Sequence, residues 1–396
     1  MASRSARRGS HARARRVSWG RRILATLGVL VLVAGGGSLV ALKVLQGNIR
    51  TVDLTPMLGT ARPSAAPVNP DGGRAITILV MGSDSRDGAN GFIGGKEDGA
   101  RSDTTLVVHL AADRTWAAAV SIPRDSVVQV PDCLDPATEL ITAGSRRMFN
   151  DAFTTGGPAC TLKTVESLTG LRIDHWVVVD FNGFKNVVDA LGTVPICLAE
   201  PVDDPKHGIH LPAGRSEVNG TTALAYVRER YKIGDGSDLG RIDRQQAFLS
   251  SVLQKATSAG TLANPARTYS FLDAVTKSLV MNPELASLSR LAGFAQDIQK
   301  VGLKKIRFIT VPNGPDPEDA NRLVWIDSAE TLWTALREDR PIDAGKAGAT
   351  PSPSRPTRPT PSSSSEAATP GSSPSPSGVV LNGVTVRTAD ADICPP

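Results

Sequence analysis

The chain has 396 residues, of which 40% are hydrophobic and 21% are charged, so it is long enough for one large domain or two ordinary ones with tails. Its formal net charge is +5, but residues 1–22 hold eight arginines and no acidic residue. Without this segment the chain is slightly acidic. The positive net charge therefore gives no support for nucleic-acid binding, and we expect no nucleic-acid partner.

A stretch of twenty uncharged residues, Ile23–Leu42, follows these arginines. A helix that crosses a bilayer needs about 20 mostly apolar residues, and arginines before it favour a cytoplasmic N-terminus. We therefore expect residues 23–45 to form a single transmembrane helix, with the rest of the chain extracytoplasmic at the cell membrane. A cleaved signal peptide is the alternative. The length of the apolar run, and the lack of a good cleavage site soon after it, argue against that alternative.

Composition divides the chain further. A polar, proline-bearing stretch follows the apolar segment, and a dense series of periodic segments begins at Arg74. Near Asp343 the composition shifts to Pro, Ser, Thr, Ala and Gly, which cannot bury a core and is typical of disordered linkers. We expect these parts: a cytoplasmic tail (1–22), the anchor (23–45), a stalk (46–73), the folded domain (74–343), a linker (344–378) and a short tail too small to fold alone (379–396).

The folded part alternates strands and helices. Strands are predicted at Ala75–Met81, Thr104–Leu110, Trp116–Ile122, His175–Phe181, Val194–Leu198 and Ile306–Val311. Helices are predicted at Cys160–Leu168, Gly183–Leu191, Thr221–Arg230, Arg241–Ala256, Arg267–Leu279, Glu284–Val301 and Ser328–Arg337. Interleaving of this kind indicates a layered α/β domain.

The first three strands predict where a site would lie. The connection after Leu110 is short, so the second and third strands should form a hairpin. If the first two strands are also antiparallel, three polar loci meet at one sheet edge. They are Gly82–Arg86, Arg101–Asp103 and Pro123–Asp125.

The four cysteines all follow the expected anchor, where disulfides can persist. No two of them form a CxxC pair, so a zinc or redox motif is not indicated. Cys133 with Cys160 is the most local pairing, and it would leave Cys197 with Cys394. Two free, buried cysteines are the alternative to that second bond.

Two carboxylates at the predicted edge, Asp84 and Asp103, are candidate metal ligands. Hard oxygen ligands suit Mg²⁺ or Mn²⁺, above all when substrate phosphates complete the coordination shell. Ordinary ion pairs of these acids with Arg86 and Arg101 are the alternative.

Arginines provide the second candidate group. Arg228 and Arg230 stand at a predicted helix end, while Arg241 shares one face of the next helix with Arg244 and Gln245. The planar guanidinium group binds phosphate in a bidentate manner, which suits diphosphate recognition. A solvated arginine face is the alternative, although both helices are also strongly apolar.

Several segments, in order, resemble the signature blocks of LytR-CpsA-Psr proteins over about residues 75–258. They are ILVMGSDSR (78–86), RSDTTLVVHL (101–110), VSIPRDS (120–126), FNDAFTTGG (149–157), VDFNGFKNVVDALGTVPICL (179–198), GTTALAYVRER (220–230) and GSDLGRIDRQQAFL (236–249). The alanine-rich composition, with more arginine than lysine, looks actinobacterial.

The resemblance implies a three-layer α/β/α domain with a central mixed sheet that holds a polyprenyl diphosphate lipid. By the family's pattern, Asp84 and Asp103 would bind Mg²⁺ (or Mn²⁺), and an apolar tunnel would take the prenyl chain. Asp238 would be the base for the incoming sugar hydroxyl. The diphosphate would be held by Arg124, Arg228, Arg230, Arg241 and Gln245, with the arginines also acting in catalysis.

The activity that this resemblance implies is a Mg²⁺-dependent phosphotransferase of cell-wall biogenesis. It would move a glycan phosphate from the polyprenyl carrier onto a peptidoglycan sugar hydroxyl. The alternatives are a non-catalytic protein that binds prenyl-linked glycans for wall assembly and a polyprenyl diphosphate pyrophosphatase. The sequence does not distinguish which glycopolymer is carried.

Overall fold

The computed structural model describes residues 36–37, 39–69, 73–83, 102–136, 138–205, 209–229, 233, 236–344, 379–381 and 384–394. The chain divides into two units, one ending at Gly47 and the other beginning at Asn48. The expected cytoplasmic tail, most of the expected anchor and the expected linker lie outside the described residues. No helix within the described ranges combines the length and the apolar character that crossing a bilayer requires.

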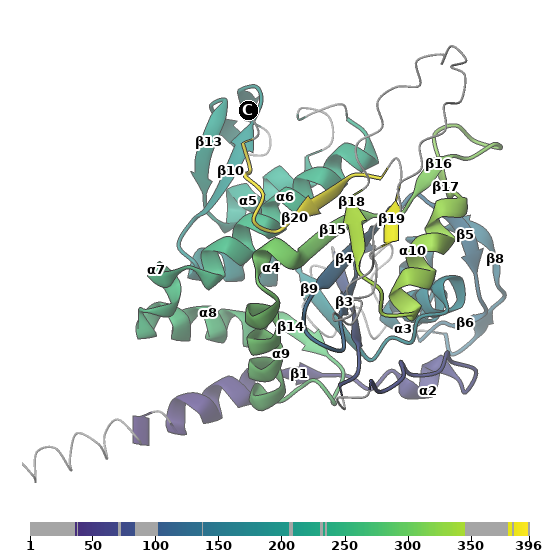
Figure 1. The fold of residues 1–396 in the computed structure, drawn as a ribbon, viewed down its shortest axis with the longest axis horizontal. Helices are drawn as coiled ribbons and strands as arrows, with labels where there is room; N and C mark the ends of the chain where they lie inside the picture. Colours follow the sequence, from purple (N-terminus) through teal and green to yellow (C-terminus); the bar gives the residue numbers. More distant parts are fainter. Residues whose placement is uncertain are drawn as a thin grey trace, which may run out of the picture. The chain divides into compact units, whose positions relative to one another are not determined.

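An eight-stranded sheet forms the centre of the second unit, in the order β1-β14-β9-β2-β3-β4-β15-β20 (Figure 1). Its three middle strands are antiparallel, whereas β2·β9, β4·β15 and β1·β14 are parallel, so the sheet is mixed as expected. The strand bounds are β1 Arg50–Thr51, β2 Ile76–Ser83, β3 Ser102–Leu110, β4 Ala117–Ile122, β9 His175–Asp180, β14 Leu279–Met281, β15 Ile306–Thr310 and β20 Val386–Thr388.

Helices cover both faces of this sheet, because successive residues of a strand point to opposite sides. Leu79 and Met81 of β2 join the core beneath α2 (Thr55–Leu58), α3 (Asp151–Thr169) and α10 (Asp327–Arg337). Ile78 and Val80 pack toward α9 (Leu288–Val301) on the other face. That second face also carries α4 (Phe181–Ala190), α5 (Gly220–Arg228) and α6 (Asp238–Thr257). The α/β class and the three-layer arrangement therefore agree with the sequence analysis.

Side-chain caps fix where these last three helices begin. Asp180 accepts a hydrogen bond from the Gly183 amide at 2.6 Å, and Ser237 accepts one from Gly240 at 2.9 Å. Asn219 does the same for α5 at 3.0 Å from the amide of Thr222. Such caps satisfy backbone N–H groups that have no partner within the helix.

All six predicted strands and all seven predicted helices are present, most of them with shifted ends. Val194–Leu198 (β10) pairs with β13 (Gly214–Val218) outside the central sheet. The helix predicted from Cys160 begins earlier, at Asp151, and continues past a break at Gly156 and Gly157.

Further elements complete the unit. They are β5 Val127–Val130, β6 Cys133–Leu134, β7 Ile141–Thr142, β8 Ser145–Met148, β11 Val202–Asp204, β12 Ile209–Leu211, β16 Asn313–Pro315, β17 Leu323–Trp325, α7 Ala259–Leu262 and α8 Pro265–Ser278.

The segment expected to be a stalk needs a correction, because much of it belongs to the fold. Residues 50–51 form β1, and Leu54 and Leu58 are buried in the main core. Arg62 donates two hydrogen bonds to the carboxylate of Glu166 in α3, at 2.8 and 2.6 Å. A two-residue strand and a four-residue helix are too short to produce a periodic pattern in the sequence.

The C-terminal tail also joins the fold. β20 extends the sheet alongside β15, and β19 (Val379–Leu381) pairs with β18 (Ile342–Ala344). Disulfides link Cys133 to Cys160 and Cys197 to Cys394. Both pairings anticipated from the sequence are therefore present, and the second ties the tail to β10.

Candidate active site

The predicted meeting of three loci at one sheet edge is confirmed for the strands that carry them. Because β2, β3 and β4 are antiparallel neighbours, the end of β2 lies beside the start of β3 and the end of β4. Ser83 faces Ser102, and Thr105 faces Ile122. Asp84 and Arg101 lie outside the described residues.

The strand register is irregular at Asp103. Gly82 pairs with Thr104, but Ser83 pairs with Ser102, so Asp103 is an extra residue on β3. Bulges of this kind redirect a side chain and are over-represented beside active sites. Only the backbone of Asp103 is described, so its part in a metal site stays a prediction.

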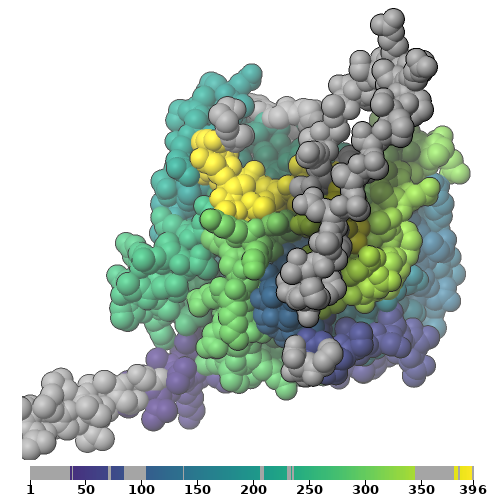
Figure 2. Space-filling view, viewed as in Figure 1, coloured from purple at the N-terminus to yellow at the C-terminus, as the bar shows by residue number. Residues whose placement is uncertain are grey.

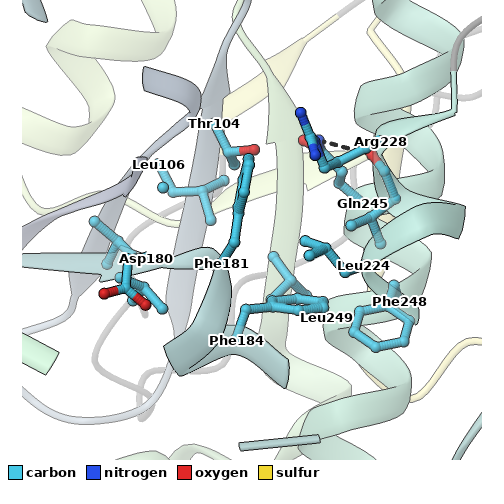
Figure 3. Close-up of a pocket in the computed structure, with 14 residues that line it drawn as sticks. Thr104, Leu106, Asp180, Phe181, Phe184, Leu224, Arg228, Gln245, Phe248 and Leu249 are labelled. Atoms are coloured by element: carbon cyan, nitrogen blue, oxygen red, sulfur yellow. Dashed lines mark hydrogen bonds between the residues drawn. The ribbon is translucent and has the colours of Figure 1, made fainter. Parts of the chain in front are cut away.

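A cavity of about 150 Å³ opens next to this edge, between the sheet and the helices α4, α5 and α6. Figure 3 shows aromatic and aliphatic side chains around it, with Phe181 and Phe184 from α4 and Leu224 from α5. Its walls are mostly apolar, which suits a hydrocarbon ligand. The lining residues are Val80, Gly82, Thr104, Leu106, Val179, Asp180, Phe181, Phe184, Leu224, Val227, Arg228, Gln245, Phe248 and Leu249.

Polar groups border one side of this cavity. The guanidinium carbon of Arg228 lies 4.1 Å from the centroid of the Phe181 ring. Gln245 donates a hydrogen bond from Nε2 to the Val227 carbonyl at 3.2 Å, which fixes it beside Arg228 (Figure 3). Arg228 is the last residue of α5, where a cation is favoured by the helix dipole.

A second group of charges surrounds Asp238 at the start of α6. Its carboxylate forms an ion pair with Arg241, and its Oδ1 lies 3.7 Å from Nε of Arg124. The side chains of Asp238 and Arg241 are 8% and 4% exposed, so this cluster is nearly removed from solvent. Two guanidinium groups and the positive end of the helix thus surround this carboxylate with positive charge.

The two groups are joined by α6. Arg241 and Gln245 are one helical turn apart, so they share a face. The helix is held to the sheet by Gln246, whose Nε2 donates to Ser121 Oγ at 2.9 Å and to Thr310 Oγ1 at 3.1 Å. The structure thus brings Arg124, Asp238 and Arg241 into one cluster, with Gln245 and Arg228 at the cavity beside it.

Two further arginines were expected near the site, Arg230 and Arg244. Arg230 lies outside the described residues. Arg244, expected on the same face as Arg241, binds the backbone carbonyls of Ile233 (2.7 Å) and Glu229. It therefore supports the loop between α5 and α6.

Phe181 lines the cavity and contacts Arg228, a role that the sequence does not predict. Its only local signal is its place after Asp180, at a junction where a strand leads directly into a helix. Within the described residues there is no group of three or more His, Cys, Asp or Glu side chains that could hold a metal ion.

The fold and the site together define the class of protein. It is an α/β protein in which a cluster of arginines lies beside an apolar cavity. The chain belongs to the LytR_cpsA_psr family, whose model matches residues 42–338.

Relatives of known name support this assignment. The cell wall biosynthesis protein LcpA of Corynebacterium glutamicum is 32% identical over 317 residues, which cover 74% of this chain and 59% of LcpA. The chain thus spans less than two thirds of that relative's length. TagV of Bacillus subtilis, a polyisoprenyl-teichoic acid–peptidoglycan teichoic acid transferase, is 36% identical over 168 residues, or 41% of each chain.

Solved structures agree on the fold. A LytR-Csp2A-Psr enzyme from Actinomyces oris superposes with a TM-score of 0.55 at 21% identity, covering 73% of this chain and 95% of that one. The crystal structure of TagV gives a TM-score of 0.52 at 27% identity, covering 67% and 96%.

Proposed function

We propose that this protein is a phosphotransferase that moves a glycan phosphate from a polyprenyl diphosphate carrier onto a sugar hydroxyl of peptidoglycan. The observation that carries the proposal is the junction of an apolar cavity with a cluster of guanidinium groups. A prenyl diphosphate is a long hydrocarbon joined to a dianionic head. The related transferase TagV acts on a polyisoprenyl-linked polymer, which favours the same chemistry here.

The prenyl chain would lie among the aromatic and aliphatic side chains of the cavity. Its diphosphate would then meet Arg228 and Gln245 at the cavity's polar side. Arg241, one turn before Gln245 on α6, and Arg124, from the loop after β4, would hold it on the side of Asp238. Phosphoryl transfer depends mainly on positioning and on neutralising charge. Arginines held in place before the substrate arrives provide both.

In the transfer step, the acceptor hydroxyl oxygen bonds to the glycan-side phosphorus. The bond from that phosphorus to the bridging oxygen breaks, and polyprenyl phosphate leaves with the electron pair. Asp238 receives the hydroxyl proton, and its two guanidinium neighbours hold the carboxylate in place. The product is a glycan joined to peptidoglycan through a phosphodiester.

Two carboxylates would hold Mg²⁺ or Mn²⁺. Asp103 stands at the bulge of β3, and Asp84 directly follows Ser83, the residue that faces Ser102. Both therefore flank one pair of neighbouring residues, and oxygen ligands of this kind fit a hard cation. When bound, the cation would neutralise diphosphate charge beside the arginines.

The proposal is tested with the full chain, a synthetic polyprenyl-diphosphate glycan and peptidoglycan oligomers, by following the mass of the product. The Asp238→Asn variant should bind the lipid but lose transfer by about 10²–10⁴-fold, because general-base catalysis contributes that much. Arg340→Ala removes a partly exposed arginine that pairs with Glu338, away from the site, and serves as the control. Equal turnover in Asp238→Asn and the control would refute the role of Asp238.

A further inference from the structure

A second cavity lies beside the apolar one, around the next face of α6. Its volume is about 240 Å³, and its walls come from β10, α5, α6 and the C-terminal tail. Phe248 of α6 lines both cavities, so the two are neighbours. Figure 2 shows the yellow tail lying against teal segments of the chain in this region. The cavity therefore exists only because four segments far apart in the sequence come together.

The tail that closes this cavity is held in place. β20 pairs with β15, and Gln254 of α6 donates a hydrogen bond to the Ala389 carbonyl at 2.8 Å. The second disulfide ties the end of the tail to β10. Arg387 of β20 donates a hydrogen bond to the Asp392 carbonyl at 2.8 Å, which fixes its guanidinium group at the cavity.

Two arginines act on one tyrosine hydroxyl at this cavity. They are Arg244 of α6 and Arg387, and both line the cavity together with Tyr226 of α5. Burial raises the pKa of the Tyr226 hydroxyl above its ordinary value of 10.0, and the two guanidinium groups act in the opposite direction. The hydroxyl is therefore a hydrogen-bond donor at neutral pH. Asp243 also lines the cavity but is exposed, so the lining carries a net positive charge.

Two hydrogen-bond donors at this cavity have no partner in the described part of the chain. The side chain of Tyr226 is nearly buried, with 4% of the residue exposed, and its hydroxyl makes no hydrogen bond to a described residue. The Nε of Arg387 is buried and also has no partner among the described residues. A buried donor that stays unpaired destabilises the fold. An acceptor group that enters the cavity would satisfy both donors.

We propose that this cavity is a second anion site, which binds a phosphate group. The oxygens of a phosphate can accept hydrogen bonds from the Tyr226 hydroxyl and from Arg387, and its charge is balanced by Arg244 and Arg387. The phosphate belongs to a repeat of a glycopolymer or to a free phosphate ester, which present the same chemistry. The inference concerns binding alone, so it does not depend on the transfer reaction proposed above.

The test uses the full chain in detergent, with fluorotyrosine at its three tyrosines. The fluorine resonance of position 226 is the one that is missing in Tyr226→Phe. Inorganic phosphate should shift this resonance in a saturable manner, whereas uncharged glycerol should not. A glycerol phosphodiester oligomer is the second phosphate probe. Tighter binding of the oligomer than of inorganic phosphate would support the site with a polymer repeat as its ligand, and weaker binding would support it with a free phosphate.

Arg387→Gln should weaken phosphate binding at least about ten-fold, because it removes a charge-assisted hydrogen bond. The matched control is Arg307→Gln. Arg307 faces Thr388 across the β15–β20 pair, so its side chain points to the other side of the sheet from Arg387, and phosphate binding should not change.

Tyr226→Phe keeps the packing of the ring and tests the hydroxyl alone. Its affinity for inorganic phosphate, measured by calorimetry, should be several-fold lower than that of the wild-type protein. Either of two results would overturn the proposal. One is the absence of a saturable shift at position 226 with both phosphate probes. The other is an unchanged phosphate affinity in Arg387→Gln and Tyr226→Phe.

Discussion

Arg228 lies over the ring of Phe181, with its guanidinium carbon 4.1 Å from the ring centroid. The arginine comes from the end of α5 and the phenylalanine from the start of α4, so the contact joins two helices that wall the cavity. A cation over an aromatic face is attracted to the ring's electron density. The contact therefore restrains the side chain of Arg228 at the polar side of the cavity. The N–H groups of Arg228 can still bind the proposed diphosphate.

Phe181→Leu should keep the cavity apolar but release Arg228. We expect kcat/KM for the lipid-linked glycan to fall about 2- to 30-fold, which corresponds to a cation–π contribution of about 0.5–2 kcal/mol. The measurement is a double-mutant cycle with Arg228→Gln. Phe184→Leu is the control, since that ring contacts Phe248 and not the arginine. Additive losses in the cycle would show that Phe181 does not act through Arg228.

Glu166 should be required for stability. Its carboxylate receives two hydrogen bonds from Arg62 and one, at 2.9 Å, from the amide of Ile173. The Glu166→Gln variant leaves Arg62 without its charge partner in a largely buried place, and we expect a loss of about 2–4 kcal/mol in the free energy of unfolding. Denaturant titration measures this loss.

The matched control is Glu338→Gln, which breaks the exposed pair with Arg340. It should change the free energy of unfolding by less than about 1 kcal/mol. If both variants lost the same free energy of unfolding, Arg62 would not hold the segment that contains β1 and α2 in the way the structure shows.

His175 should make stability depend on pH. Burial is the main cause that lowers its pKa from the ordinary 6.5, and Arg290 acts in the same direction against the nearby acids Asp174 and Glu284. Asn282 lies 3.0 Å from Nδ1 of the ring. In the unfolded chain the ring binds a proton at a higher pH than in the fold, so this group destabilises the fold as the pH falls below about 6.5.

The check on His175 is the free energy of unfolding at pH 7.5 and at pH 5.5. Its decrease between the two values should be smaller in His175→Gln than in the wild-type protein. An equal decrease in both proteins would mean that His175 does not contribute.

The Cys197–Cys394 disulfide should hold the tail on the sheet. It joins positions 197 residues apart. A disulfide of a long loop typically contributes about 2–5 kcal/mol. Replacing both cysteines by serine should lower the free energy of unfolding by that amount and increase hydrogen exchange of β20, as measured by mass spectrometry. Unchanged exchange would show that pairing with β15 alone is sufficient.

The sequence predicts the long elements well, because runs such as Thr104–Leu110 combine buried apolar residues with clear ends. The short connection after Leu110 predicts the hairpin of the second and third strands, whereas the antiparallel pairing of the first two strands was an assumption, which the structure confirms. From these features the meeting of Arg124 with the edge of β2 and β3 could be anticipated.

Other features depend on contacts between residues far apart in the sequence. β1 and β20 are two and three residues long, and each exists only because a partner strand is present. Arg244 lies on the helix face shared with Arg241, and only the fold shows that it binds the backbone of the loop before α6. The stacking of Phe181 on Arg228 likewise requires two helices to be placed.

The most direct test of the central claim is the identity of both products of one turnover. The full chain is mixed with the lipid-linked glycan, with and without peptidoglycan oligomers. The lipid and glycan products are then identified and quantified by mass spectrometry. We expect polyprenyl monophosphate and a phosphodiester-linked peptidoglycan adduct in equal amounts, formed only with the acceptor. Polyprenyl monophosphate and free glycan phosphate, formed in equal yield without the acceptor, would contradict the transferase proposal and indicate a pyrophosphatase. Bound but unchanged lipid would also contradict it and would indicate a carrier-binding protein.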